Sequence, residues 1–272
     1  MMDQAAKTEH FLALHRGPGP LLLPNAWDRG SAALLTSLGF SAIATTSSGF
    51  AATLGRLDGG ATRDEVLAHA AAMAASTSLP VSADLENCFA DDPAGVAETI
   101  RLAAGTGLAG CSVEDFTGHE DDPIYEIGPA AERVAAAAAA AHGTGGGLVL
   151  TARAENYLHG RPDLADTIRR LQAYAAAGAD VLYAPGLTRL EDIREVVASV
   201  ERPVNVLALA GAPDVPTLAE AGVARISVGG AFAFAAFGAL ADAAREFREK
   251  GSYGFLAGAR TGRDAVRAAF SS

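Results

Sequence analysis

Short apolar runs alternate along the chain with longer stretches rich in alanine and leucine. Runs of this length predict buried strands, and the stretches between them have the length of helices. Eight runs end in polar residues, and they cover 21–28, 42–49, 81–87, 110–115, 148–155, 181–186, 204–209 and 225–230. The later helices are expected near 93–105, 128–142, 163–177, 189–199, 214–221 and 232–250.

Eight alternations of this kind predict an α/β fold, the (β/α)₈ or TIM barrel. No linker divides the chain, so a single domain is expected over residues 1–272. The last stretch, 251–272, predicts an extra amphipathic C-terminal helix beyond the barrel. Phe232, Phe234 and Phe237 make the preceding helix apolar on several sides, which favours either packing on the barrel wall or an interface with another subunit.

Residues capable of chemistry collect where the expected strands end. In barrel enzymes the carboxyl ends of the strands form the face that carries the active site. Here those ends carry acids, one arginine and small polar residues, namely Asn25, Asp28, Ser48, Asp84, Glu86, Glu114, Asp115, Arg153 and Glu155. A group of carboxylates facing one arginine is the main indication of function.

The paired carboxylates predict a metal site. Asp84 and Glu86 are two positions apart, so on a strand they share a face, whereas only one of Glu114 and Asp115 can face the centre. Crowded carboxylates repel one another unless a cation neutralises them or a proton is shared. Oxygen ligands without histidine favour a hard ion, Mg²⁺ or Mn²⁺, over zinc. The alternative for each pair is a solvated acidic loop.

Arg153 and a Ser-Ser-Gly segment are candidate anion-binding groups. An arginine among small residues can donate two parallel hydrogen bonds to a carboxylate or phosphonate, and a structural ion pair is the alternative. At Ser47, Ser48 and Gly49, successive N–H groups can hold an anionic oxygen, and glycine lets the backbone approach a ligand closely. Asn205 completes the candidate substrate-binding residues.

Composition narrows the choice of partners. The net charge of −11 argues against nucleic acid and anionic membranes, although a local arginine and metal still suit a small anion. No apolar stretch reaches the ~18 residues of a membrane span, and residues 1–11 lack the apolar core of a signal peptide. Two cysteines, Cys88 and Cys111, do not make a disulfide framework, so a cytoplasmic location is expected.

Six motifs, in this order and spacing, resemble the isocitrate lyase/phosphoenolpyruvate mutase superfamily: PNAWD (24–28), TTSSGF (45–50), LGRLD (54–58), SADLE (82–86), SVED (112–115) and TARAE (151–155). The segment GVARISVGG (222–230) is similar to its last barrel strand. The resemblance implies a magnesium-dependent enzyme that acts on a small 2-oxo or 2-hydroxy acid. In the family the metal holds an enolate-like pyruvate unit while a C–C or P–C bond breaks or forms.

The resemblance also implies roles for single residues. Asp84 would bind the metal directly, and Glu86, Glu114 and Asp58 would bind it through coordinated waters. Ser48 and Gly49 would hold the substrate carboxylate, and Arg153 would bind an acidic group of the substrate. The same resemblance implies a homotetramer, a dimer of dimers that exchange the last barrel helix.

The segment after the fourth strand departs from the family. Its lyases carry there a loop with a Lys-Lys/Arg-Cys-Gly-His motif, whose cysteine is the acid–base residue. Residues 116–128 contain no cysteine, lysine or arginine, and the gating loop of the mutases is absent as well. After Ser48 and Gly49 the lyases tend to have a further glycine, whereas this chain has the bulky Phe50. In this position it resembles the branch of mutases and phosphonopyruvate hydrolases. His119 is the candidate acid–base residue of this segment, and a solvated loop histidine is the alternative.

Three functions stay open on the sequence. The first is a magnesium-dependent lyase or hydrolase that cleaves a C–C or P–C bond through an enolpyruvate-like intermediate. The second is a phosphonomutase that interconverts phosphoenolpyruvate and phosphonopyruvate. The third is a non-catalytic barrel that binds a metabolite, and the retained Asp84, Glu114 and Arg153 argue against it. Glu114, Arg153 and His119 are the predicted catalytic residues.

Overall fold

Eight parallel strands form the centre of the protein in a computed structural model that describes residues 3–143 and 147–271. Their order around the sheet is β1-β8-β7-β6-β5-β4-β3-β2. The strands are β1 (Leu21–Leu23), β2 (Ile43–Ala44), β3 (Val81–Asp84), β4 (Gly110–Glu114), β5 (Val149–Arg153), β6 (Val181–Tyr183), β7 (Val204–Leu207) and β8 (Arg225–Ser227). All eight predicted strands are confirmed.

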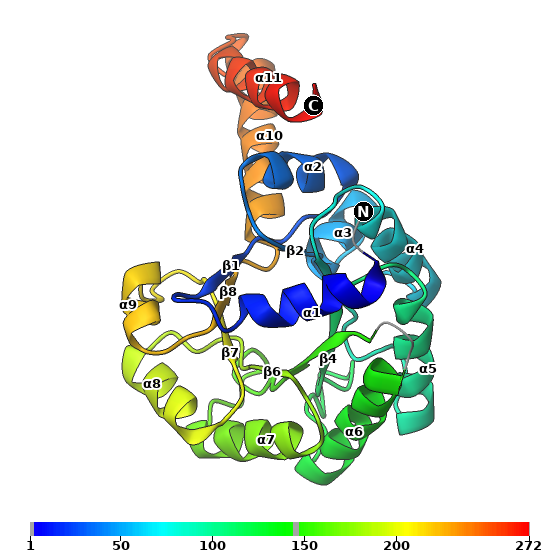
Figure 1. Cartoon of the computed structure of the whole chain (residues 1–272). Helices are drawn as coiled ribbons and strands as arrows, with labels where there is room; N and C mark the ends of the chain where they lie inside the picture. The colour runs from blue at the N-terminus through cyan, green and yellow to red at the C-terminus, as the bar shows by residue number, and fades with distance from the viewer. Residues whose placement is uncertain (1–2, 144–146, 272) are drawn as a thin grey trace.

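The first and second strands close the ring just beyond their ends. Asn25 and Ala44 form a parallel bridge, and the N–H of Ala26 donates to the carbonyl of Ala44 at 2.8 Å. The Asn25 side chain joins three strand ends, because its Nδ2 donates to the carbonyl of Thr45 and its Oδ1 accepts from the N–H groups of Val228 and Gly229. The predicted TIM barrel is therefore confirmed as a nearly closed ring of strands with flanking helices (Figure 1).

The helices follow the strands in alternation. They are α1 (Gln4–Leu14), α2 (Arg29–Ser37), α3 (Ser47–Thr53), α4 (Arg63–Ala74), α5 (Pro93–Ala104), α6 (Ile127–Gly143), α7 (Leu164–Ala176), α8 (Leu190–Ser199), α9 (Val215–Glu220), α10 (Ala231–Lys250) and α11 (Leu256–Phe270). Each of the six later helices predicted from the sequence is present. Among the described residues, none of these helices has both the length and the hydropathy to cross a membrane.

Helix α1, which the sequence analysis did not predict, covers the amino-terminal end of the barrel (Figure 1). Its Phe11 is fully buried against residues at the starts of the strands, among them Leu21, Val149 and Val181. His15, the residue that caps α1, is 5 % exposed and also points into the barrel. This end is therefore closed, and a ligand has to enter at the carboxyl ends of the strands.

Helices α10 and α11 extend away from the ring (Figure 1). In α10 only Ala233 is buried among the described residues, and Phe234 and Leu240 are 52 % and 64 % exposed. Helix α11 packs against α2, so the predicted extra C-terminal helix is confirmed. Phe232, Phe234 and Phe237 remain 39–52 % exposed, so packing on the barrel covers them only in part, and an interface with another subunit stays a prediction.

Candidate active site

A cavity of about 180 Å³ opens at the carboxyl ends of the strands. Barrel interiors are usually filled by bulky branched side chains. Here β3, β4 and β8 present the small side chains of Ser82, Ser112 and Ser227 to the cavity instead. The space exists because these inward positions are small and polar. Predicted site residues on its wall are Asn25, Ser47, Ser48, Asp58, Asp84, Arg153 and Asn205.

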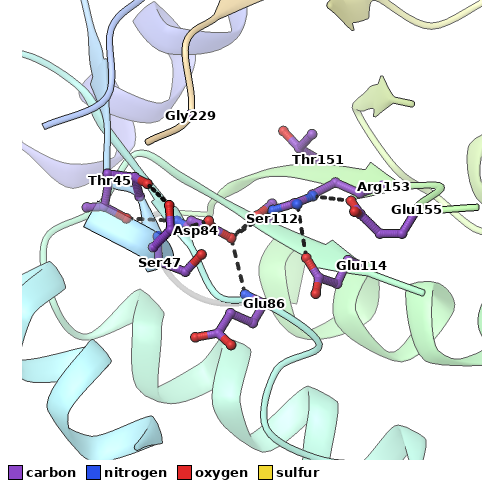
Figure 2. A network of polar contacts seen from close by, with 12 residues as sticks. Thr45, Ser47, Asp84, Glu86, Ser112, Glu114, Thr151, Arg153, Glu155 and Gly229 are labelled. Atoms are coloured by element: carbon purple, nitrogen blue, oxygen red, sulfur yellow. Dashed lines mark hydrogen bonds and ion pairs between the residues drawn. The ribbon is translucent and has the colours of Figure 1, made fainter. Parts of the chain in front are cut away.

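Arg153 is the centre of the polar network at the cavity mouth. Its side chain leaves the end of β5 and contacts three carboxylates (Figure 2). The nitrogen–oxygen distances are 2.9 Å to Asp84, 3.1 Å to Glu114 and 2.7 Å to Glu155. The structural ion pair that was the alternative for Arg153 is thus formed, with both Glu114 and Glu155. Its role toward a substrate stays a prediction.

Asp84 is held in place at the end of β3 by backbone and hydroxyl groups. Its Oδ2 accepts the N–H of Ser47 at 3.1 Å, and its Oδ1 accepts the N–H of Glu86 at 3.3 Å (Figure 2). Its own N–H donates to Oγ1 of Thr45 at 2.9 Å. The carboxylate is therefore oriented from both sides before any ligand binds.

Glu86 reaches the site by a different route from the one predicted. Strand β3 ends at Asp84, so the argument from alternating faces does not apply to Glu86. The chain turns there through left-handed conformations at Glu86 (φ 50°), Cys88 (φ 61°) and Phe89 (φ 56°), which are unfavourable for residues other than glycine. Arg133 of α6 holds this turn by donating to the carbonyls of Asn87, Ala90 and Asp91. The turn, and not the strand, places Glu86 beside Asp84.

The carboxylates at the mouth are crowded. Burial raises the pKa of Glu86 to about 8, and the negative charges of Asp84 and Asp58 add to the rise. Burial also raises the pKa of Asp58, and Asp84 contributes to that shift. An additional cation would relieve this repulsion. These all-oxygen donors fit Mg²⁺ or Mn²⁺ by their chemistry. In the described residues, however, no three acidic, histidine or cysteine side chains are arranged to hold an ion, and Arg153 contacts both Asp84 and Glu114 instead.

The Ser-Ser-Gly segment begins helix α3 and does not end strand β2. Ser47 and Ser48 line the cavity, but Gly49 is buried, and its N–H donates to Oγ1 of Thr46 at 3.3 Å. A Cβ at Gly49 would lie 2.6 Å from Cγ2 of Thr46 and 3.1 Å from Cβ of Ala233. A side chain at this position would crowd Thr46 and Ala233, so packing alone accounts for the glycine, and its role toward a ligand stays a prediction.

Several predicted acids have structural partners. Asp28 caps helix α2. Asp115 points away from Arg153 and accepts hydrogen bonds from Arg170, from Tyr174 and from the N–H of Glu155. Glu114 therefore is the member of the adjacent pair that faces the centre, in agreement with the prediction that only one can.

The structure does not bring His119 to the cavity. His119 is exposed and lies in a loop that closes on itself, where the N–H of Thr117 donates to the carbonyl of Pro123 at 2.8 Å. Phe116 at the start of this loop stacks on His159, with 3.9 Å between the ring centroids. The solvated loop histidine, weighed as the alternative, agrees with this position.

Tyr183 and Arg225 line the cavity and were missed on the sequence. Both are polar residues at inward positions of otherwise apolar strands. Arg225 precedes Ser227 by two positions, so period-two alternation along β8 was the signal available. Asn205, which was predicted, lies between them, with its amide bonded to Arg225 and Ser227.

Comparison with known proteins identifies the family of the chain. The profile of the family named phosphoenolpyruvate phosphomutase matches residues 11–248. A crystal structure from Burkholderia cenocepacia J2315, described only in general terms as a lyase or mutase, is 52 % identical, with a TM-score of 0.93 over 97 % of this chain and 95 % of that one. An uncharacterized protein of Mycobacterium tuberculosis is 35 % identical over 86 % of this chain and 87 % of its own length. The 2-methylisocitrate lyase of Escherichia coli K12 is 29 % identical over 71 % of this chain and 67 % of its own length.

The family match and these relatives identify the protein as an enzyme of the phosphoenolpyruvate mutase/isocitrate lyase superfamily, whose members are lyases, hydrolases or mutases. The chain belongs to the phosphoenolpyruvate phosphomutase family.

Proposed function

We propose that the protein is a Mg²⁺-dependent lyase or hydrolase that cleaves a C–C or P–C bond of a small 2-oxo or 2-hydroxy acid and releases an enolpyruvate-like unit. The observation that carries this proposal is the cluster of Asp58, Asp84, Glu86 and Glu114 around Arg153 at the mouth of a small polar cavity. Relatives of the same family include a 2-methylisocitrate lyase and a 2,3-dimethylmalate lyase.

The metal would be held by Asp84, with Glu86, Glu114 and Asp58 placed to bind its coordinated waters. When bound, Mg²⁺ or Mn²⁺ supplies positive charge that stabilises the developing enolate oxygen. Asp84 suits this role because Ser47, Glu86 and Thr45 fix its orientation.

The residues around the metal position would bind and orient the acid. Ser47 and Ser48 lie on the cavity wall at the start of α3, where their hydroxyl groups would meet a substrate carboxylate. Arg153 carries a fixed positive charge at the mouth, which would stabilise negative charge formed during bond cleavage. Its planar guanidinium is kept in place by Glu155, which is 2 % exposed.

The direct test is release of pyruvate from a panel of 2-oxo and 2-hydroxy acids that includes oxaloacetate and phosphonopyruvate, with Mg²⁺, with Mn²⁺ and with a chelator. Metal-dependent release from at least one acid is expected. Conversion of phosphonopyruvate into phosphoenolpyruvate without release of phosphate would identify a phosphonomutase. The absence of turnover across the panel, with metal present, would contradict the proposal and favour a metabolite-binding barrel.

We also propose that a second copy of the chain covers α10, in a homotetramer built from dimers that exchange this helix. The support is the row of exposed apolar side chains on a helix that leaves the barrel, where Phe232, Phe234 and Phe237 are 40 %, 52 % and 39 % exposed. Exposed apolar surface of this extent usually marks an interface. Light scattering at micromolar concentration tests this, and a monomer would refute it. The two free, buried cysteines agree with the reducing cytoplasm that we propose as its location.

A further inference from the structure

Arg225, the first residue of β8, lies at the floor of the cavity and is 4 % exposed. Its Nε donates to Oδ1 of Asn205 at 3.0 Å, and its Nη2 donates to Oγ1 of Thr151 at 3.1 Å. Its Nη1 lies 3.3 Å from Nε2 of His15, the residue that caps α1. The guanidinium is therefore fixed by groups from β5, β7 and the end of α1.

All three partners of Arg225 are electrically neutral. Nδ1 of His15 lies 2.9 Å from the carbonyl of Phe11, and a carbonyl only accepts, so Nδ1 carries the ring proton. Nε2 is then free to accept from Arg225. Burial, with the charge of Arg225, lowers the pKa of His15 to about 3, which keeps the ring neutral at neutral pH. Within 3–143 and 147–271, no carboxylate forms an ion pair with Arg225.

A buried cation without a counter-charge is costly, because its lost hydration is not replaced by an opposite charge. Burial lowers the pKa of Arg225 to about 10, so the side chain still carries its proton at neutral pH. A guanidinium has five N–H donors, and the three contacts use three of them. The floor of the cavity thus combines a fixed positive charge with spare donors.

The geometry points to a second anion-binding subsite at this floor, in which Arg225 and Ser227 receive one carboxylate group of a small dicarboxylate whose other end is bound at the cavity mouth. This inference rests on the proposed function and narrows its substrate class to 2-oxo or 2-hydroxy dicarboxylates. An anion at the floor would supply the opposite charge that Arg225 lacks.

The size of the cavity suits a carboxylate group. About 180 Å³ holds a small metabolite, whereas drug-sized ligands need about 300 Å³ or more. Ser82, Ser112 and Ser227 on the wall are small and offer hydroxyl donors. A flat carboxylate can accept two N–H groups of one guanidinium side by side.

The test compares two acids that differ in the second carboxylate alone. L-Malate and 2-hydroxybutyrate are both four-carbon 2-hydroxy acids, and calorimetry with Mg²⁺ present measures their binding. The wild type is expected to bind malate at least about tenfold more tightly, as one charged hydrogen-bonded contact implies. Arg225→Met removes the charge at similar length and should abolish the preference, whereas Arg225→Lys should retain part of it. Arg202→Met, at an exposed arginine near the start of β7, should behave as the wild type.

Two readouts separate loss of the subsite from loss of the fold. Circular dichroism and the melting temperature report the fold of each variant. By NMR, the pKa of His15 should rise in Arg225→Met, because the adjacent positive charge is gone. Equal affinity for both acids in the wild type, no measurable binding of malate, or an unchanged preference in folded Arg225→Met would each overturn the inference.

The proposed reaction and this subsite can fail separately. If no acid of the panel releases pyruvate but Arg225→Met loses the preference for malate, the reaction is wrong and the subsite stands. If metal-dependent release of pyruvate occurs but folded Arg225→Met keeps the preference, the subsite is wrong and the reaction stands.

Discussion

Two arginines on the wall of one cavity have opposite surroundings. Arg153 at the mouth contacts Asp84, Glu114 and Glu155, whereas Arg225 at the floor contacts Asn205, Thr151 and His15. At the mouth the arginine partly neutralises a surplus of negative charge. At the floor it is itself the unbalanced charge. Residue type alone therefore does not define the role of an arginine, because the surrounding groups decide whether it neutralises negative charge or remains an unbalanced positive charge.

The largest effect is expected from removing the central carboxylate of the mouth. Asp84→Ala should weaken Mg²⁺ binding by more than about 100-fold and abolish activity, because a direct ligand matters more than the outer groups that typically give 10–100-fold. The fold should persist, since one repelling charge beside Glu86 and Asp58 is gone. Calorimetry with Mg²⁺ and release of pyruvate measure this. Asp122→Ala, an exposed loop carboxylate, is the control. Unchanged Mg²⁺ affinity in Asp84→Ala would exclude Asp84 as the ligand.

Substitution of each arginine by methionine tests whether Arg153 and Arg225 differ in their charged partners. Arg153→Met leaves three carboxylates unpaired and should lower the free energy of unfolding by about 3–5 kcal/mol at neutral pH. Arg225→Met leaves only neutral groups without their partner and also removes a buried charge. The free energy of unfolding should therefore fall by no more than about 1–2 kcal/mol. Urea unfolding measures both.

The pH dependence of these two variants should differ as well. In Arg153→Met the unpaired buried carboxylates take up protons more readily in the folded state than in the unfolded state. Its stability relative to the wild type should therefore recover as the pH falls. Equal losses for both variants at neutral pH would mean that Arg225 has a negative partner after all.

His15 makes the floor sensitive to acid. Its pKa is about 3 in the folded protein and near 6.5 in an unfolded chain. The unfolded state therefore binds a proton below pH 6.5 that the folded state does not bind. The contribution of neutral His15 to the free energy of unfolding is therefore fully present above pH 6.5. Below that pH the free energy of unfolding falls by up to about 1.4 kcal/mol per pH unit toward pH 3.

His15→Gln should remove most of this dependence of stability on pH. His10→Gln, at an exposed position, should leave it unchanged. Urea unfolding at pH 7 and pH 5 measures the difference. The same pH dependence in His15→Gln and in the wild type would show that other groups govern acid sensitivity.

The smallest effect is expected at the two cysteines. Cys88 and Cys111 are both fully buried, and burial raises the pKa of Cys111 to about 12. Alkylation of the native protein should change activity less than about twofold, because little thiolate forms. Cleavage of isocitrate and methylisocitrate should be poor, since residues 116–128 carry no thiol. Rapid methylisocitrate cleavage that alkylation destroys would overturn this prediction. Mass spectrometry of native and unfolded samples controls for the extent of labelling.

Much of the barrel could be predicted because strand and helix periodicity are local properties. The runs that end in Asp84, Glu114 and Arg153 are strands β3, β4 and β5, and barrel geometry brings their ends together. Helix α1 was missed because its role depends on a distant surface, the starts of the strands that Phe11 covers. The start of α3 at Ser47 was missed because the cap at Thr46 resembles a strand end in sequence.

Local sequence is enough to predict the alternation of strands and helices, the carboxylates at the strand ends and the absence of a thiol after β4. These follow from neighbouring residues and from the rule that parallel strands end at one face. Three features depend on long-range contacts: Glu86 reaches the site through a left-handed turn, His119 lies outside the cavity, and Arg225 contacts His15 at the floor. Arg225 and His15 are 210 positions apart, and a charge becomes buried and unbalanced only when the folded chain determines which groups surround it.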